Sequence, residues 1–158
     1  MTFLRLPLVL FLTFALFSCS DDGPTGNDDD GGNNNNTSSF SDEVTATLNG
    51  DAWTASNYEA FRADNSAVLA VTLAAHGPGN SDVAFGVAFA SEKTFTIEEG
   101  SGVEGSFEYE GVTYGSNETG TITISTLTSK GMKGSFTINA ESSTGEKGTA
   151  VGTFDVSF

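Results

Sequence analysis

The chain has 158 residues with six basic and 21 acidic side chains, which gives a formal net charge of −15. Such an acidic chain repels phosphate backbones and has no basic patch, so its composition disfavours nonspecific nucleic-acid binding. With one cysteine and one histidine it has no internal disulfide and no His/Cys metal cluster, which leaves oxygen ligands for calcium as the only kind of cation site.

Residues 1–18 have the pattern of a lipoprotein signal peptide. Arg5 supplies positive charge, and residues 6–17 form an apolar run that is too short to cross a bilayer as a helix. The run ends at Leu16-Phe17-Ser18-Cys19, which resembles the lipobox of bacterial lipoproteins, although Phe17 is bulkier than is usual there. The resemblance implies that Cys19 becomes the first mature residue and carries acyl chains, palmitate among them, that hold the protein to a membrane. An ordinary cleaved signal with an incidental cysteine is the alternative.

The residues that follow Cys19 indicate export and a flexible tether. Ser20, Asp21 and Asp22 resemble the signal that sends lipoproteins of the Bacteroidota to the outer face of the outer membrane, so we expect the domain to face the cell exterior. The alternative is that these aspartates only begin an acidic linker. Residues 19–41 contain one aromatic residue and no aliphatic residue after the cysteine, so they cannot bury enough surface to fold, and we predict a disordered tether.

Residues 42–158 form the predicted folded domain, with five basic and 16 acidic residues for a net charge of −11. Apolar and polar residues alternate with a period of two, and Gly, Asn, Asp and Ser interrupt the pattern at short intervals. No stretch shows helical spacing with caps. The pattern therefore predicts one all-β domain, an antiparallel β-sandwich or small barrel-like meander of about nine or ten strands.

The strongest local signal in the domain is Asn49-Gly50, because both residues tolerate the positive φ of a two-residue hairpin turn. In that register Leu48 pairs with Asp51 and Ala46 with Trp53. A lone tryptophan in a secreted β-protein suggests sugar stacking, but its register with the apolar face favours a core position.

The second half repeats a motif of glycine, hydroxyl, apolar, polar and apolar residues, in which we expect the glycine to open each strand or mark a bulge. The repeats begin at Gly105, Gly120, Gly134 and Gly152. With Asn49-Gly50 and residues 53–55, they make the chain resemble an uncharacterised family of secreted Bacteroidota lipoproteins. The resemblance implies a secreted antiparallel β-fold and brings no catalytic residues.

Two neighbouring strands have apolar residues on both faces. Residues 67–75 and 83–90 each carry bulky side chains on one face and small side chains on the other, and residues 76–81 join them in a turn-forming stretch. The small face either lies under other parts of the fold or floors an apolar groove for a ligand. The predicted groove residues are Ala70, Thr72, Ala74, Ala84, Gly86 and Ala88.

Nothing in the sequence forms a catalytic triad, because His76 is in a turn-forming stretch and no nucleophile elbow occurs. The densest acidic group could supply a carboxylate pair for glycoside hydrolysis, although its strand positions favour a solvated face. Its members are Glu98, Glu99, Glu104, Glu108 and Glu110.

We therefore expect a membrane-anchored surface lipoprotein that is a non-catalytic binding or structural module, with an acidic glycoside hydrolase as the alternative. The expected partners are the membrane, through the lipid anchor, and a glycan, a small apolar ligand or an outer-membrane protein. We expect no catalytic residues, no cofactor, no metal and no nucleic acid.

Overall fold

The computed structural model describes residues 39–65 and 68–158. The predicted acylation site Cys19 and the predicted export signal, Ser20 to Asp22, lie outside the described residues. In the described part of the chain the fold has ten strands and no helix, and so no helix that could span a membrane. The strands are β1 (Glu43–Leu48), β2 (Asp51–Thr54), β3 (Asn57–Asp64), β4 (Leu69–Gly77), β5 (Ser81–Val87), β6 (Lys93–Ile97), β7 (Val103–Tyr109), β8 (Val112–Leu127), β9 (Gly131–Ser142) and β10 (Lys147–Ser157).

All ten strands belong to one antiparallel sheet, which confirms the predicted fold class. The order is β2-β1-β10-β9-β8-β7-β5-β4-β3, and β6 also pairs with β8. The sheet curls because β8 takes part in both of its halves: its first residues pair with β7 and its later residues with β6, while β9 follows its other edge. Register shifts between Tyr114 and Thr119 mark the bend, as bulges do in strongly curved strands.

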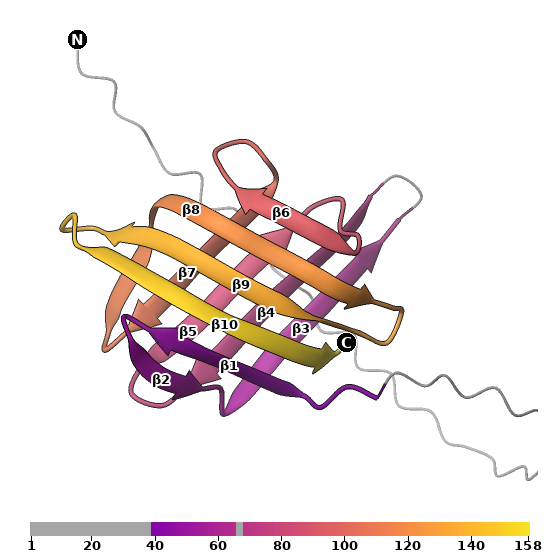
Figure 1. The fold of residues 1–158 in the computed structure, drawn as a ribbon, viewed down its shortest axis with the longest axis horizontal. Helices are drawn as coiled ribbons and strands as arrows, with labels where there is room; N and C mark the ends of the chain where they lie inside the picture. The colour runs from indigo at the N-terminus through magenta and orange to yellow at the C-terminus, as the bar shows by residue number, and fades with distance from the viewer. Residues whose placement is uncertain (1–38, 66–67) are drawn as a thin grey trace, which may run out of the picture. The chain divides into compact units, whose positions relative to one another are not determined.

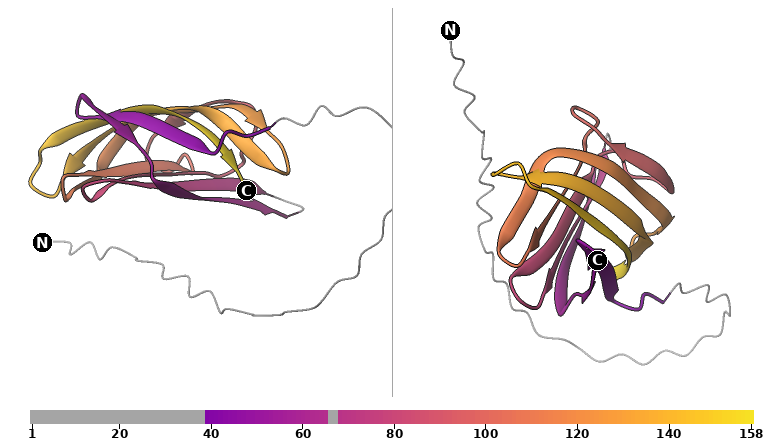
Figure 2. Two further views of the ribbon diagram at one scale, coloured as in Figure 1. Left: turned by 90° about the horizontal axis from the view of Figure 1, so that it is seen from below. Right: turned by 60° about the vertical axis from the view of Figure 1, so that its left-hand side comes forward.

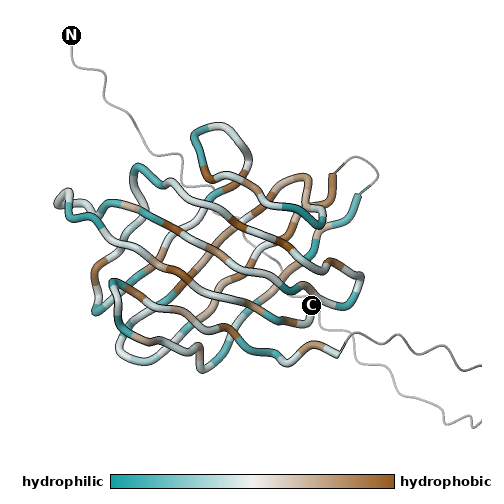
Figure 3. The backbone as a smooth tube through the Cα atoms, viewed as in Figure 1, coloured by the Kyte–Doolittle hydropathy of each residue, from teal (hydrophilic) through white to brown (hydrophobic). Residues whose placement is uncertain are grey.

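The curled sheet forms two layers whose strands cross. Figure 1 shows β1, β10, β9 and β8 in front of β7, β5, β4 and β3, and the left view of Figure 2 shows the two layers from the side. We call them the front and back layers. Apolar and polar positions alternate along most strands of both layers (Figure 3), and the bulky apolar side chains turn inward. β4 and β5 are exceptions, because small residues also occupy their outer face. The layers meet at Phe85 of β5, whose ring lies 6.1 Å from Phe136 and 5.1 Å from Phe154 between centroids.

The first hairpin has the predicted register. Asn49 and Gly50 have φ angles of 51° and 97°, and Ala46 pairs with Trp53. Trp53 is 7% exposed and belongs to the hydrophobic core, which confirms the core position over a sugar-stacking surface. Its indole lies where a side chain on Gly77 would be, because a Cβ there would come within 2.1 Å of Nε1.

None of the four repeated glycines opens a strand, which corrects one of the two expectations from sequence. Gly105, Gly120, Gly134 and Gly152 lie inside β7, β8, β9 and β10. Gly120 and Gly134 lie next to register shifts in the β8–β9 pairing, in keeping with the other expectation, a bulge. At Gly152 a Cβ would lie 2.2 Å from the carbonyl oxygen of Thr45 and 2.6 Å from the ring of Phe136. At Gly134 and Gly152 a neighbouring backbone and an aromatic ring therefore fill the space of a side chain, and at Gly105 the side chain of Ile138 does so.

The packed part of the chain extends back at least to Ser39, beyond the predicted start at Asp42. Lys133 lies 5.3 Å from the ring centroid of Phe40 and donates a hydrogen bond to the carbonyl oxygen of Ser39, while the backbone N–H of Ser41 donates to Asp155. Phe40 is the one aromatic residue of the predicted tether. Its apolar ring explains why the end of that segment packs on the sheet.

The two end strands of the sheet, β2 and β3, do not pair with each other. Side chains on β3 instead reach across the gap: the Tyr58 hydroxyl donates to Asp42, and Arg62 donates to the carbonyl oxygen of Thr128. Hydrogen bonds from Ser157 and Tyr58 lower the pKa of Asp42. The inner face of β3 is thus held to the front layer by polar contacts, and its outer face is left to solvent.

Candidate binding site

The outer face of the back layer carries small side chains at its centre. Leu73 of β4 and Phe85 of β5 point into the core and are 1% and 3% exposed, so their neighbours along each strand point outward. Strand register places the outward residues in transverse rows. One row is Phe61, Thr72, Gly86 and Glu104, and the next is Glu59, Ala74, Ala84 and Ser106.

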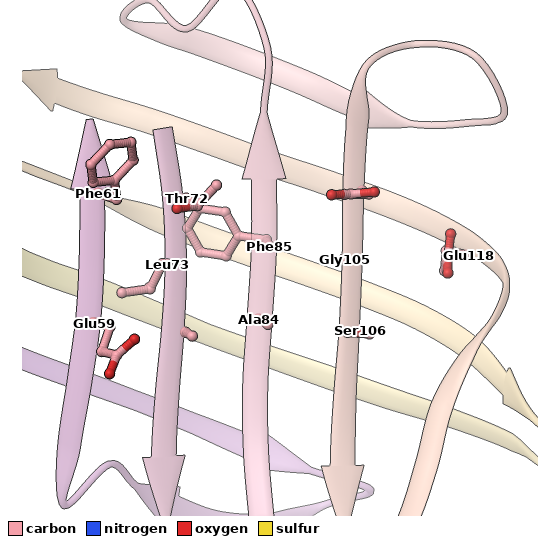
Figure 4. A pocket seen from close by; sticks show the side chains of 11 residues that line it. Glu59, Phe61, Thr72, Leu73, Ala84, Phe85, Gly105, Ser106 and Glu118 are labelled. Carbon is pink, nitrogen blue, oxygen red and sulfur yellow. The ribbon is translucent and has the colours of Figure 1, made fainter. Parts of the chain in front are cut away.

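A pocket of about 350 Å³ lies over these two rows. We call it the trough. Glu59 and Phe61 of β3 form one side, Glu104 of β7 and Glu118 of β8 form the other, and the small residues of β4 and β5 form the floor (Figure 4). Its full lining is Glu59, Phe61, Thr72, Leu73, Ala74, Ala84, Phe85, Glu104, Gly105, Ser106 and Glu118. The side chain of Phe61 is exposed although it is large and apolar, with 57% of its surface in contact with solvent.

The predicted groove residues all lie on this face. Thr72, Ala74 and Ala84 line the trough, while Ala70 and Ala88 continue the same face beyond it and are half-buried. Gly86 is buried because the side chain of Glu104 covers it, with Oε1 3.2 Å from where a Cβ would be. The small face is therefore not sealed by another layer, and it adjoins a cavity.

The carboxylates of the trough have no internal counter-ion. Glu59, Glu104 and Glu118 have no hydrogen bond or ion pair within residues 39–65 and 68–158. Arg62, the basic residue of β3, instead pairs with Asp64 and the front layer. Burial and the charge of Glu104 raise the pKa of Glu118. One side of the trough is thus an uncompensated pair of carboxyl groups.

Comparison with known proteins assigns the fold to a family. A family described as a domain of unknown function, DUF6252, matches residues 33–155. The chain belongs to this family. No curated protein and no solved structure matches the chain. The DUF6252 match covers β1 to β9 and nearly all of β10, so the family region contains every strand that forms the trough.

The DUF6252 sheet separates the five acidic residues that the sequence groups together. Only Glu104 lines the trough. Glu98 and Glu99 lie beyond β6, Glu110 is at the β7–β8 turn with a φ of 52°, and Glu108 lies one row beyond the trough, where it accepts a hydrogen bond from Thr113. The convergent carboxyl groups are instead Glu59, Glu104 and Glu118, two of which sequence reasoning did not single out.

Other titratable groups of the DUF6252 domain do not extend this site. His76 lies in the same row as Glu108, with Nδ1 3.1 Å from Asp82. In the described ranges no three His, Cys, Asp or Glu side chains are grouped so that they could hold a metal ion. The arrangement therefore offers a small apolar floor, one exposed aromatic ring and negative charge on both sides.

Replacing Glu118 with glutamine should raise the melting temperature at neutral pH. A carboxyl group with a raised pKa is destabilising when ionised, so the domain gains from its protonation at low pH and loses that gain as pH rises through the raised pKa. The variant should therefore be more stable than the wild type above that pKa and equally stable below it. Thermal unfolding followed by circular dichroism between pH 4 and pH 8 measures this, and a lower melting temperature at pH 8 would contradict it.

Proposed function

We propose that the protein is a lipid-anchored cell-surface lipoprotein whose β-domain is a non-catalytic binding module, with the trough as its ligand site. The observation that carries the proposal is the outer face of the back layer. A sheet face that meets only solvent normally carries polar side chains, yet here alanines line a pocket beside an exposed phenylalanine. Apolar surface in a concave site with a few charged groups is typical of small-molecule sites.

The lipoprotein part of the proposal depends on the sequence pattern around Cys19 and on the composition that follows it. A polar tether between an acylated cysteine and an acidic domain lets the domain stand away from an anionic membrane surface. In that arrangement the trough is available to ligands in the medium.

A matched pair of substitutions on β4 tests whether the face is a free site. Ala74 lines the trough and is half-buried, whereas its neighbour Ala75 points into the core and is 0% exposed. Ala75→Leu should lower the free energy of unfolding by about 1–3 kcal/mol because the core is already filled. Ala74→Leu should change it by less than about 0.5 kcal/mol, because the added carbons enter the trough. Chemical denaturation measures both.

The same pair tests binding. Ligands are first found by a thermal-shift screen of the full-length chain in mild detergent, as compounds that raise its melting temperature. They should no longer raise the melting temperature of Ala74→Leu, in which the leucine fills the trough, but should still raise that of any folded fraction of Ala75→Leu. Two results would contradict the proposal: a stability loss in Ala74→Leu equal to that in Ala75→Leu, or ligands that bind Ala74→Leu as they bind the wild type.

Glycoside hydrolysis is the second candidate, favoured by the raised pKa of Glu118 beside Glu104 in a pocket, since a general acid needs a raised pKa. Glu104 and Glu118 lie on the same side of the trough, whereas a glycosidase places its two carboxyl groups on opposite sides of the scissile bond, so the second carboxyl group would have to be Glu59 across the floor. Release of nitrophenol from a panel of nitrophenyl glycosides, abolished by Glu118→Gln, would establish the enzyme in place of the binding module.

A further inference from the structure

We propose that the trough binds a small organic cation, a primary ammonium group on an apolar body. This inference rests on the proposed binding function and names the chemical class of the ligand. The charge of the site is the first argument. Glu59, Glu104 and Glu118 line the trough, and no lysine, arginine or histidine does. An anionic ligand would add to the repulsion already present, whereas a cation would relieve it.

The basic side chains of the domain do not supply that cation themselves. Arg62 pairs with Asp64, Lys133 with Asp155 and Lys147 with Glu141. Lys93 lies over the ring of Phe95, and Lys130 lies in the turn between β8 and β9; neither lines the trough. His76 lies beside Asp82. Within residues 39–65 and 68–158 the carboxylates of the trough therefore have no partner, and unpaired charges of this kind select a ligand of opposite charge.

The shape of the site favours an organic cation over a metal ion. In the described residues no three carboxyl groups are grouped so that they could hold a metal ion, and the floor between the charged sides, Thr72, Ala74 and Ala84, offers methyl groups and one hydroxyl rather than a shell of oxygen ligands. Phe61 presents its ring in the same row as Glu104. An aromatic face opposite carboxylates is the combination that recognises ammonium groups, because the ring quadrupole also attracts a cation.

The dimensions favour a small molecule over a polymer. Phe61 and Glu104 are three strands apart, which places their Cα atoms about 14 Å from each other, and both side chains reduce the space between them. A volume of about 350 Å³ is at the small end of the range for ligand pockets. A ligand of about six to ten carbon and nitrogen atoms, roughly the size of phenethylamine, fits between these sides.

The test uses phenethylamine as the cation and 2-phenylethanol as its uncharged counterpart, titrated into the full-length chain in mild detergent and followed by NMR chemical-shift changes. We expect phenethylamine to bind and 2-phenylethanol to bind about tenfold more weakly or not at all. Glu104→Gln and Glu118→Gln should each weaken phenethylamine binding about three- to tenfold, and added salt should weaken it as well. Glu118→Gln should do so while raising the melting temperature, which a loss of structure would not.

Matched variants outside the trough serve as controls. Glu108→Gln removes a carboxylate one row away, and Phe89→Ala removes a phenylalanine that is 66% exposed and does not line the trough. Both should bind phenethylamine as the wild type does, whereas Phe61→Ala should bind it more weakly.

Several outcomes would overturn the inference. Equal binding of the amine and the alcohol would show that charge is not recognised, and equal effects of Glu104→Gln and Glu108→Gln would place the site elsewhere. Binding of a tetralysine peptide without binding of phenethylamine would assign the carboxylates to a protein partner. If only neutral ligands bind and Ala74→Leu blocks them, this inference fails while the proposed function stands; if Ala74→Leu blocks no ligand, the proposed function fails as well.

Discussion

Replacing Gly134 with alanine is expected to destabilise the domain by about 3 kcal/mol or more, because the added methyl group has no space. A Cβ at this position would lie 1.9 Å from the carbonyl oxygen of Thr123 and 2.5 Å from the ring of Phe154. Gly134 pairs with Phe154 on β10 and with Ile124 on β8. Relief of the clash would therefore require the central strands of the front layer to separate.

Two glycine–phenylalanine pairs between β9 and β10 show why glycine is needed at position 134. Gly152 of β10 pairs with Phe136 of β9, and Phe154 of β10 pairs with Gly134 of β9. Each phenylalanine ring lies over the glycine of the neighbouring strand, and both rings contact Phe85 from the back layer. A methyl group on Gly134 would thus displace one of the rings that join the two layers.

Gly115→Ala is the control, since it makes the same change in β8 without a clash. The nearest atom to a Cβ at Gly115 is the Cβ of Ser106 at 3.6 Å, an ordinary contact. Its free energy of unfolding should change by less than about 0.5 kcal/mol. Urea denaturation of both variants measures the difference. Equal stability of Gly134→Ala and Gly115→Ala would mean that the front layer adjusts in a way that the strand register does not suggest.

The parts of the fold that the sequence predicts are those determined by local alternation. Asn49-Gly50 defines the first hairpin, and its register brings Trp53 to the core because side chains two residues apart share a face. The role of Gly134 is not local. It depends on Thr123 and Phe154, which lie on neighbouring strands, and spacing along the chain does not show that a neighbour fills the space of a missing side chain.

The same distinction holds for the trough: residues placed by local alternation can be predicted from sequence, and the others cannot. The small residues of β4 and β5 share a face by alternation alone, so Thr72, Ala74 and Ala84 can be grouped from sequence. Glu118 cannot, because register shifts in β8 between Tyr114 and Thr119 break the alternation that would say which way it points. The outward position of Phe61 cannot be predicted for another reason. Arg62 occupies an inward position of β3, so the sequence of that strand shows no continuous apolar face.

Replacing Cys19 with alanine is expected to abolish incorporation of a fatty-acid label and to release the processed protein from the membrane fraction. Under the proposed anchoring, acyl chains on Cys19 would hold the processed protein to the bilayer, since residues 20–41 are polar and residues 42–158 carry a net charge of −11. Ser20→Ala is the matched control: it changes the next residue and part of the predicted export signal but leaves the cysteine that is expected to be acylated, so the label should remain.

Protease added to intact cells then separates anchoring from export. It should degrade the wild-type domain and spare a Ser20→Ala protein that stays inside the outer membrane. Label that persists in Cys19→Ala would contradict acylation at this residue, and a wild-type domain that resists protease until the outer membrane is opened would place it in the periplasm, where the ligand of the trough would have to be found instead.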